Sequence, residues 1–266
     1  MSLKEHVKNR FLLFLILTLL SSTSVARINM GIPDNVTVVA APQVREMMEN
    51  KSYVLINSLS DIEFNIQHIP GSINIPVDEM IDNPLHYPPL PDNKEIPLIF
   101  YCMGSRCPYS RIAAKEAVKR KYQHVFWFRG GIAEWRKYQY SMIQDRSIID
   151  IKIKKLTPDK VIKIIESEDI FILDVRPKWF SQEIEDIFSN GYVIGTNASI
   201  PMVDLHARIN ELPNNRPILV TDGVMFQSIN TGKYLKQQGY NVIGVLKGGI
   251  VRWAKEKKPM IETLQD

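Results

Sequence analysis

Two cysteines lie five residues apart in the first half of the chain. Cys102 and Cys107 are the only cysteines among the 266 residues, and the segment between them is Met103-Gly104-Ser105-Arg106. A thiolate is a strong nucleophile near neutral pH, and two thiols this close could also form a disulfide. We therefore expect local sulfur chemistry. Because no second pair of Cys or His stands at metal-ligand spacing, we expect no metal site, and the reaction that such a thiol performs needs no organic cofactor.

Cys102 is placed where a strand gives way to a helix. The run from Leu98 to Cys102 (LIFYC) is typical of a buried strand, and a helical pattern follows from about Tyr109 to Arg120. Loop N–H groups and the positive end of the helix dipole lower the pKa of a thiol at this position. Gly104 permits a positive φ, and Arg106 adds a cation. The sequence thus predicts Cys102 as a nucleophile inside a substrate cradle formed by Met103 to Cys107.

The elements around this loop alternate between strand and helix. Apolar runs at residues 53–57 (YVLIN), 98–102 and 124–128 (HVFWF) are separated or followed by helical patterns, the last of which passes through Trp135. This alternation indicates a parallel sheet covered by helices on both faces. Ligands of such sheets bind beyond the carboxyl ends of the strands, where Cys102 is expected.

An internal repeat with a period near 117 residues divides the chain. Ala41-Pro42 and Thr157-Pro158 each open a helical pattern, and YVLIN (53–57) matches FILDV (171–175). Gly71 with Ile75-Pro76 matches Gly195 with Ile200-Pro201, and the segment 130–135 matches 248–253. Two homologous domains follow, at residues 36–146 and 150–262.

Several motifs of the two halves are similar to those of one family. They are His68-Ile69-Pro70-Gly71-Ser72-Ile73-Asn74-Ile75-Pro76, then Tyr101-Cys102 with Gly104, Cys107, Ser110, Ala113 and Ala114, then Gly130-Gly131-Ile132 with Trp135, and in the second half Leu173-Asp174-Val175-Arg176-Pro177 and Gly248-Gly249-Ile250 with Trp253. With these motifs the chain resembles tandem rhodaneses, a family of sulfurtransferases. The resemblance implies an α/β fold with two rhodanese-like domains, each a five-stranded parallel sheet with helices on both faces. It also implies that Cys102 carries the sulfur.

The second domain departs from the first at this position. The run ILVT leads to Asp222, which is 18 residues before Tyr240, whereas Cys102 is 20 residues before Tyr122. We therefore expect the second domain to be inactive. The first domain also departs from the family, because Ile56-Asn57-Ser58 stands where the resemblance leads us to expect Asp-Val-Arg.

The first 26 residues have the pattern of a secretory signal peptide. Lys4, Lys8 and Arg10 precede an apolar run at residues 11–20, and Ser24-Val25-Ala26 supplies small residues at a cleavage site. We expect an exported protein, in the bacterial periplasm, without stable membrane insertion after cleavage. An uncleaved membrane anchor is the alternative, although the apolar run is shorter than the roughly 20 residues of a membrane span.

Three classes of function fit these observations. The leading one is an exported sulfurtransferase that moves a sulfane sulfur from a small anionic donor, such as thiosulfate or polysulfide, to a thiol or other nucleophilic acceptor through a Cys102 persulfide. The second is a sulfur carrier or binding protein that serves a sulfur-metabolising partner, and the third is a thiol redox protein that uses Cys102 and Cys107. Because the net charge is only +4 and the basic residues are scattered, we expect no nucleic-acid binding.

Some residues keep more than one interpretation. Cys107 fits a resolving thiol, a disulfide partner of Cys102 or a buried packing residue, and Arg106 fits a substrate contact or a solvated cation. For His68 a structural role is favoured over that of a general base. Trp135 and Trp253 are expected in the core, packed on the sheets.

Overall fold

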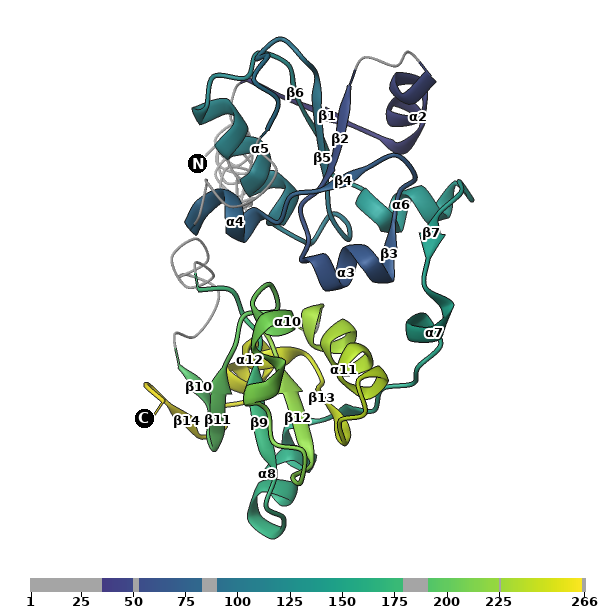
Figure 1. The fold of residues 1–266 in the computed structure, drawn as a ribbon. Helices are drawn as coiled ribbons and strands as arrows, with labels where there is room; N and C mark the ends of the chain where they lie inside the picture. The colour runs from purple at the N-terminus through teal and green to yellow at the C-terminus, as the bar shows by residue number, and fades with distance from the viewer. Residues whose placement is uncertain (1–34, 50–52, 83–89, 179–190, 225, 265–266) are drawn as a thin grey trace, which may run out of the picture. The chain divides into compact units, whose positions relative to one another are not determined.

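The structure is a computed structural model that describes residues 35–49, 53–82, 90–178, 191–224 and 226–264 (Figure 1). The expected signal peptide at residues 1–26 lies outside these ranges. The described residues contain two five-stranded sheets, and every pair of neighbouring strands in both sheets is parallel. The prediction of two α/β domains with parallel sheets is confirmed.

The first domain has its strands in the order β1-β6-β5-β2-β4, which places β5 in the centre. A short antiparallel pair, β3 with β7, lies outside this sheet. The elements are β1 (Val36–Val39), α2 (Ala41–Glu49), β2 (Val54–Asn57), α3 (Asp61–Ile66), β3 (Gln67–His68), β4 (Ile73–Asn74), α4 (Val77–Asp82), β5 (Leu98–Tyr101), α5 (Tyr109–Lys119), β6 (Val125–Phe128), α6 (Gly131–Lys137), β7 (Ile143–Gln144) and α7 (Arg146–Ile149).

The second domain repeats this arrangement with the strand order β11-β9-β12-β13-β8, in which β12 is central. A short antiparallel pair joins β10 and β14. The elements are β8 (Lys155–Leu156), α8 (Pro158–Ser167), β9 (Phe171–Asp174), β10 (Tyr192–Val193), β11 (Thr196–Ser199), α10 (Leu205–Arg208), the 3₁₀ turn η1 (Ile209–Glu211), β12 (Ile218–Thr221), α11 (Gln227–Gln237), β13 (Val242–Leu246), α12 (Gly249–Lys255) and β14 (Met260–Ile261).

Helices cover both faces of each sheet. In the first domain, α4 and α5 lie on one side of the sheet and α2 and α6 on the other (Figure 1). In the second domain, alternate residues of β12 enter different cores: Ile218 and Val220 pack with Leu235 of α11, whereas Leu219 packs with Trp253 of α12. Since side chains alternate across a strand, a buried central strand needs apolar residues on both faces.

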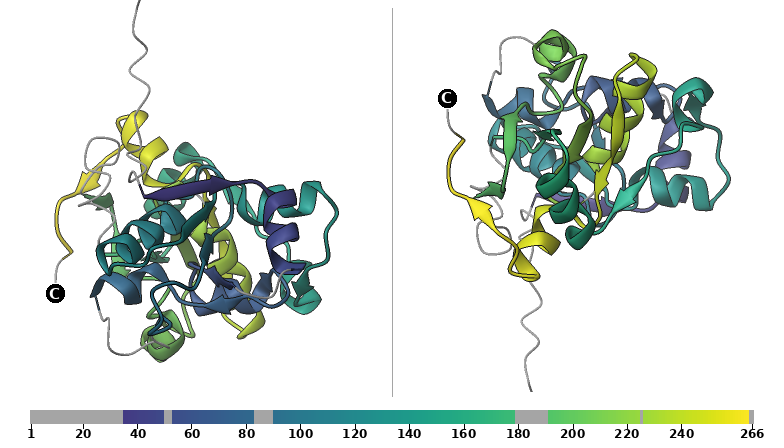
Figure 2. Two further views of the ribbon diagram at one scale, coloured as in Figure 1. Left: turned by 90° about the horizontal axis from the view of Figure 1, so that it is seen from above. Right: turned by 90° about the horizontal axis from the view of Figure 1, so that it is seen from below.

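The central strand of the first domain is buried along its whole length. Residues 98–101 are 0% exposed, as expected for an apolar run flanked by two parallel neighbours. β1 forms one edge of the sheet and leads directly into α2 (Figure 2). At the start of α8, Thr157 Oγ1 accepts the N–H of Lys160 at 3.4 Å, which caps the helix as the Thr-Pro motif predicts.

The strand register corrects one alignment made from the sequence. Asn57 lies opposite Tyr101, and Asp174 lies opposite Thr221. Ile75 donates its N–H to the Asn57 carbonyl, as Ile200 does to that of Asp174. The segment equivalent to Asp174-Val175-Arg176 is therefore Asn57-Ser58-Leu59, and the sequence alignment at Ile56-Asn57-Ser58 was one residue out of register. The short strands have similar apolar content at both registers, so periodicity could not decide between them.

Among the described residues, no helix has both the length and the apolar character needed to cross a membrane.

Candidate active site

Cys102 follows the last residue of β5, at the carboxyl end of the central strand. Its carbonyl accepts the N–H of Ile132 at 3.0 Å, and the carbonyl of Met103 accepts the N–H of Ala133 at 3.0 Å. Gly131 makes this close approach possible: its φ is +52°, and a Cβ at this position would lie 2.1 Å from the Cys102 carbonyl oxygen. The start of α6 thus fixes the backbone from which the thiol projects.

The Cys102 thiol is only 1% exposed and lies among hydrogen-bonding groups. The Ser110 hydroxyl donates to Cys102 Sγ at 3.2 Å, and the indole N–H of Trp127 donates to Ser110 Oγ at 3.0 Å. Because the indole occupies one lone pair of the hydroxyl oxygen, the Ser110 proton remains directed at the sulfur. The Cys102 thiol also donates to the carbonyl oxygen of Cys107, at 3.4 Å.

The two thiols have opposite pKa shifts. Burial raises the pKa of Cys102, but hydrogen bonds from the side chains of Cys107 and Ser110 and from the N–H groups of Ser110 and Gly104 lower it to about 7. Burial raises the pKa of Cys107 well above its usual value, and its hydrogen bond to Cys102 raises it further. About half of Cys102 is therefore thiolate at pH 7, whereas Cys107 stays a neutral thiol.

Residues 103–107, which we call the sulfur loop, curl back on themselves. The N–H of Cys107 donates to the carbonyl of Gly104 at 2.9 Å. Met103 is half-buried and Ser105 is exposed. Arg106 is also exposed, and its guanidinium carbon lies 5.6 Å from the centre of the Phe226 ring. The structure brings the predicted loop residues together around Cys102, and their roles in substrate binding stay predictions.

The sequence analysis missed one acidic residue near the thiols. Glu63, in α3, is 1% exposed, and its carboxylate accepts hydrogen bonds from Ser60 Oγ at 3.2 Å and from Asn230 Nδ2 at 3.2 Å. Burial raises the pKa of Glu63 to about 7, and the charge of Cys102 contributes to the increase. No described Lys, Arg or His lies within ion-pair distance of this carboxylate.

The structure assigns other candidates to the scaffold. A ring nitrogen of His68 lies 2.8 Å from the Phe64 carbonyl oxygen, and the two rings stack at 3.9 Å, which agrees with the structural role favoured from the sequence. Trp135 and Trp253 are both 0% exposed, so the prediction of core positions is confirmed. Within the described ranges, no group of three or more His, Cys, Asp or Glu residues could hold a metal ion.

Asp222 occupies the position of Cys102 in the second domain. Its carbonyl accepts the N–H of Ile250 at 2.9 Å, just as the carbonyl of Cys102 accepts that of Ile132. Its carboxylate accepts the N–H of Ser228 at 2.9 Å. The second strand end therefore carries an anion of its own, which occupies a backbone donor at the start of α11.

The comparison with protein families agrees with this duplicated strand-end geometry. The Rhodanese-like domain matches twice, over residues 40–138 and 157–256. The chain belongs to the rhodanese-like family. Both copies of the domain lie in one chain, so the tandem organisation expected from the repeat is confirmed, and the family supports a sulfurtransferase-type enzyme in general terms.

Individual relatives are similar to parts of this rhodanese-like chain. The uncharacterized protein YibN of Escherichia coli (strain K12) is 27% identical over 112 residues, which are 41% of this chain and 73% of that protein. A sulfurtransferase of Allochromatium vinosum is 27% identical over 100 residues, which are 37% of this chain and 85% of that protein. The solved thiosulfate sulfurtransferase of Pseudomonas aeruginosa aligns with a TM-score of 0.42 and 17% identity, over 86% of this chain and 44% of its own.

Proposed function

We propose that this protein transfers sulfane sulfur through a persulfide on Cys102. The observation that carries the proposal is the hydrogen bonding of Cys102, because donors of Cys107, Ser110 and Gly104 lower the pKa of its buried thiol to about 7. Donors that stabilise a thiolate also stabilise the anion of a persulfide at the same position. The rhodanese-like family supplies the reaction class, and the strand-end cysteine supplies the nucleophile.

The proposed reaction has two halves. The Cys102 thiolate attacks the outer sulfur of thiosulfate, a new S–S bond forms, and sulfite leaves with the electron pair of the broken S–S bond. An acceptor thiolate then attacks the outer sulfur of the persulfide, and Cys102 leaves as a thiolate. Polysulfide serves the first half in the same way, with a shorter polysulfide as the leaving group. Neither half needs an external oxidant or reductant.

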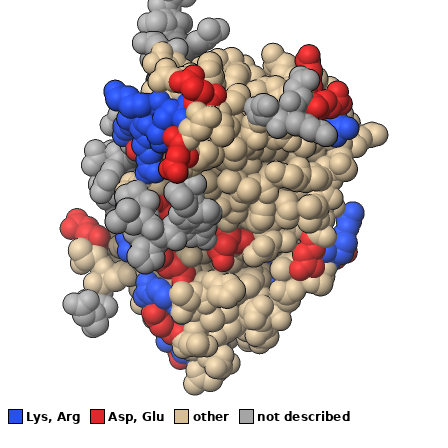
Figure 3. Space-filling view, turned by 45° about the horizontal axis from the view of Figure 1, so that its top comes forward, with Lys and Arg blue, Asp and Glu red and all other residues tan. Residues whose placement is uncertain are grey.

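Surface charge supports a small donor over a polyanion. On the face drawn in Figure 3, one group of Lys and Arg at the upper left is bordered by Asp and Glu, and the other Lys and Arg are scattered, so they form no stripe over that face. A nucleic acid would need a continuous basic path. The apolar run at residues 11–20 supports the further proposal that the reaction takes place after export.

Mass spectrometry of the intact protein tests the proposed function. After incubation with thiosulfate and removal of the excess, we expect the mass of one added sulfur atom, which a dithiol reductant removes. Peptide mapping should place this sulfur on Cys102, and Cys102→Ser should gain none, because a hydroxyl there is not an activated nucleophile. An equal mass gain in Cys102→Ser would overturn the assignment.

A further inference from the structure

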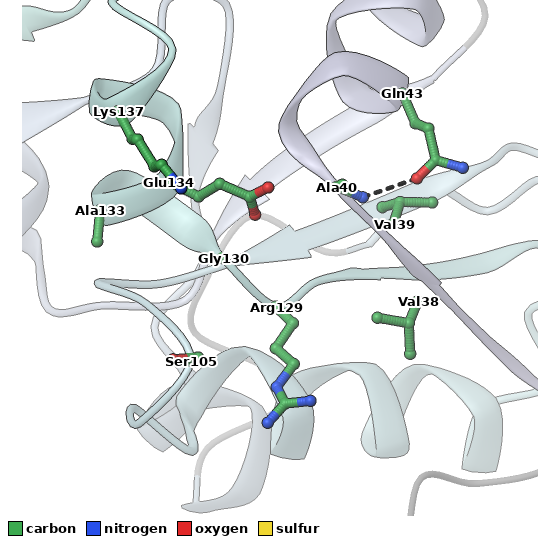
Figure 4. Close-up of a pocket in the computed structure, with 10 residues that line it drawn as sticks. All are labelled: Val38, Val39, Ala40, Gln43, Ser105, Arg129, Gly130, Ala133, Glu134 and Lys137. Atoms are coloured by element: carbon green, nitrogen blue, oxygen red, sulfur yellow. Dashed lines mark hydrogen bonds between the residues drawn. The ribbon is translucent and has the colours of Figure 1, made fainter.

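A hollow of about 570 Å³ lies between β1 and α6 of the first domain (Figure 4). Glu134 of α6 lines it, and the carboxylate of this residue extends toward Ala40. Cys102 is not among the described residues that line the hollow, and its Sγ contacts Ser110 of α5, on the opposite face of the sheet from α6. The groups that act on the sulfur therefore lie away from this hollow.

The groups around the sulfur form a buried cluster. Four of its members titrate, and each is at most 6% exposed: Glu63 of α3, Cys102, Cys107 and Tyr109 of α5. Glu63 interacts electrostatically with each of the other three. Gln67 Nε2, directly after α3, lies 4.0 Å from Met103 Sδ, so the end of α3 packs against the sulfur loop. The cluster therefore brings an acid of α3 next to the nucleophile.

Both domains hold the carboxyl of Glu63. Ser60 Oγ donates to it from the first domain at 3.2 Å, and Asn230 Nδ2 donates from α11 of the second domain, also at 3.2 Å. Neither partner is charged, and burial raises the pKa of Glu63 to about 7. About half of this carboxyl therefore carries a proton at pH 7. A group that gains and loses a proton near neutral pH is suited to proton transfer.

Charged groups on the elements around α3 interact with other residues. His206 of α10 lies 3.7 Å from Asp61, and Tyr234 of α11 interacts with the same carboxyl. α7 presents one charged residue, Arg146, which is exposed. The lysines of α11 donate to backbone carbonyls of α7 and the segment after it: Lys233 to Ile149 and Lys236 to Lys152. The acids that act on Tyr109 besides Glu63 are Asp78 and Asp222. The charge of Cys102, by contrast, acts on Glu63 and raises its pKa.

The two halves of the proposed reaction differ in their need for a proton. When the Cys102 thiolate takes the outer sulfur of thiosulfate and sulfite leaves, charge is conserved and the persulfide is left as an anion. The negative charge on its outer sulfur repels the electron pair of an incoming thiolate. A proton on that sulfur removes the repulsion, so an acid near Cys102 assists the second half and is not needed in the first.

We propose that Glu63 carries the proton of this cycle and that Asn230 of the second domain positions its carboxyl. After loading, the carboxylic acid of Glu63 gives its proton to the outer sulfur, which becomes a neutral S–SH group. The acceptor thiol then loses its proton to the Glu63 carboxylate and attacks as a thiolate. Its sulfur bonds to the outer sulfur, the persulfide S–S bond breaks, and Cys102 takes the electron pair. This inference rests on the proposed function, because the proton is needed only if Cys102 carries a persulfide.

Separate measurement of the two half-reactions tests the role of Glu63. Sulfite release from thiosulfate reports loading, and loss of the added sulfur mass after addition of 2-mercaptoethanol reports unloading. In Glu63→Gln at pH 7, we expect unloading to slow at least tenfold. Loading should change no more than about twofold, because about half of Cys102 is already thiolate. The ratio of wild-type to variant unloading rates should fall as the pH rises above about 7, where Glu63 loses its proton.

Two further acids and amides serve as controls. Glu134→Gln changes the acid that lines the hollow on the other face of the sheet and should alter neither half-reaction. Asn230→Ala leaves the carboxyl of Glu63 without one of its donors and should slow unloading but not loading. Asn230→Asp keeps the size of the side chain and adds a carboxylate beside Glu63, so the pH above which the unloading ratio falls should increase.

The outcomes separate this inference from the proposed function. If wild type and Glu63→Gln both gain one sulfur and release it at the same rate at every pH, the proposed function stands and the proton role is wrong. Equal slowing of both half-reactions in Glu63→Gln and in Asn230→Ala would assign the two residues to the scaffold and overturn the inference. If wild type gains no sulfur, the proposed function fails and the inference fails with it. Retained loading also shows that a variant is folded.

Discussion

The two domains hold the end of the central strand with the same backbone bonds. In the first, the carbonyl of Cys102 accepts from Ile132, and in the second, the carbonyl of Asp222 accepts from Ile250. The side chains differ: Cys102 Sγ receives hydrogen bonds from neighbouring donors, whereas the Asp222 carboxylate accepts the Ser228 N–H at 2.9 Å. The fold supplies a position for an anion, and the residue at that position decides whether the anion is a nucleophile.

A second difference lies one strand away. In the second domain, Asp174 accepts two hydrogen bonds from Arg176 Nε, at 2.9 and 3.0 Å, and the N–H of Arg176 at 2.9 Å. In the first domain, Asn57 accepts the N–H of Leu59 at 2.9 Å, so the backbone bond remains while both charges are lost. The buried carboxyl of Glu63 in α3 accepts hydrogen bonds from Ser60 and Asn230.

The buried carboxyl of Glu63 predicts the largest effect on stability. Because burial raises the pKa of Glu63 from 4.5 to about 7, the folded protein retains a proton that the unfolded chain releases. Stability from this group is therefore present below about pH 4.5 and is lost as the pH rises through about 7. Glu63→Gln should remove this dependence, a change on the order of 3 kcal/mol between the two ends of that range.

Urea unfolding at a series of pH values measures this contribution. The free energy of unfolding of the wild type should decline relative to Glu63→Gln between about pH 4.5 and about pH 8. Glu166→Gln, which changes an exposed acid of α8, is the matched control and should follow the wild type. Parallel curves for wild type and Glu63→Gln would show that the carboxyl ionises in the folded protein as it does in the unfolded chain.

Cys107, the second cysteine of the chain, distinguishes the active strand end of the first domain from the inactive one of the second. Cys107→Ala removes a hydrogen bond that lowers the pKa of Cys102, so we expect that pKa to rise by about one unit. At pH 7 the thiolate fraction would then fall from about one half to about one tenth. The pH dependence of alkylation by iodoacetamide measures the change. Cys107→Ser keeps a donor and should lie between wild type and Cys107→Ala.

The same variant decides among the roles left open for Cys107. A resolving thiol displaces the outer sulfur of the persulfide, so its removal should lengthen the lifetime of the sulfur on Cys102. If Cys107 only donates a hydrogen bond, its removal should leave the lifetime of the persulfide unchanged or shorten it. The raised pKa of Cys107, caused first by burial, favours the second result, because a neutral thiol is a poor nucleophile. A longer persulfide lifetime in Cys107→Ala would instead show that Cys107 acts as a resolving thiol.

The sequence predicted the position of the nucleophile but not the residues that surround it. An apolar run followed by a cysteine and a helical pattern predicted that Cys102 ends a buried strand, because this signal is local and the neighbours of a central strand are necessarily apolar. The repeat likewise placed Asp222 at the equivalent position. Contacts between distant segments gave no such signal: Asn230 donates to Glu63 across 167 positions of the chain.

The absence of the Asp174–Arg176 ion pair from the first domain was nevertheless visible in the sequence. In the correct register, Asn57 and Leu59 stand where the second domain has Asp174 and Arg176, so the first domain lacks both charges of that pair. The error of one residue at Ile56-Asn57-Ser58 concealed this exchange. Short strands of four residues carry too few landmarks to fix a register, and the hydrogen bonds of Ile75 and Ile200 decided it.

A smaller effect is expected from the cation of the sulfur loop. Arg106 is exposed and lies over the ring of Phe226, so its charge is screened by solvent. Arg106→Ala should raise the half-saturation concentration of thiosulfate about threefold to fivefold and lower the maximal rate less, since a binding cation acts on ground and transition states alike. Arg106→Lys, which keeps the charge, should recover most of the difference. An unchanged half-saturation concentration would assign Arg106 to the solvated surface.

A cysteine at the strand end of the second domain should gain no sulfur. Asp222→Cys, made together with Cys102→Ser, places a thiol at the equivalent strand end of the second domain. That position is 2% exposed, and burial raises the pKa of a thiol. The chain reaches α11 five residues after Asp222, whereas α5 begins seven residues after Cys102, so no counterpart of Cys107 is present. We therefore expect no added sulfur by mass spectrometry after thiosulfate treatment, with a melting temperature that shows a folded protein. Sulfur on residue 222 would mean that the shared backbone alone activates a thiol, and that the donors around Cys102 only adjust the rate.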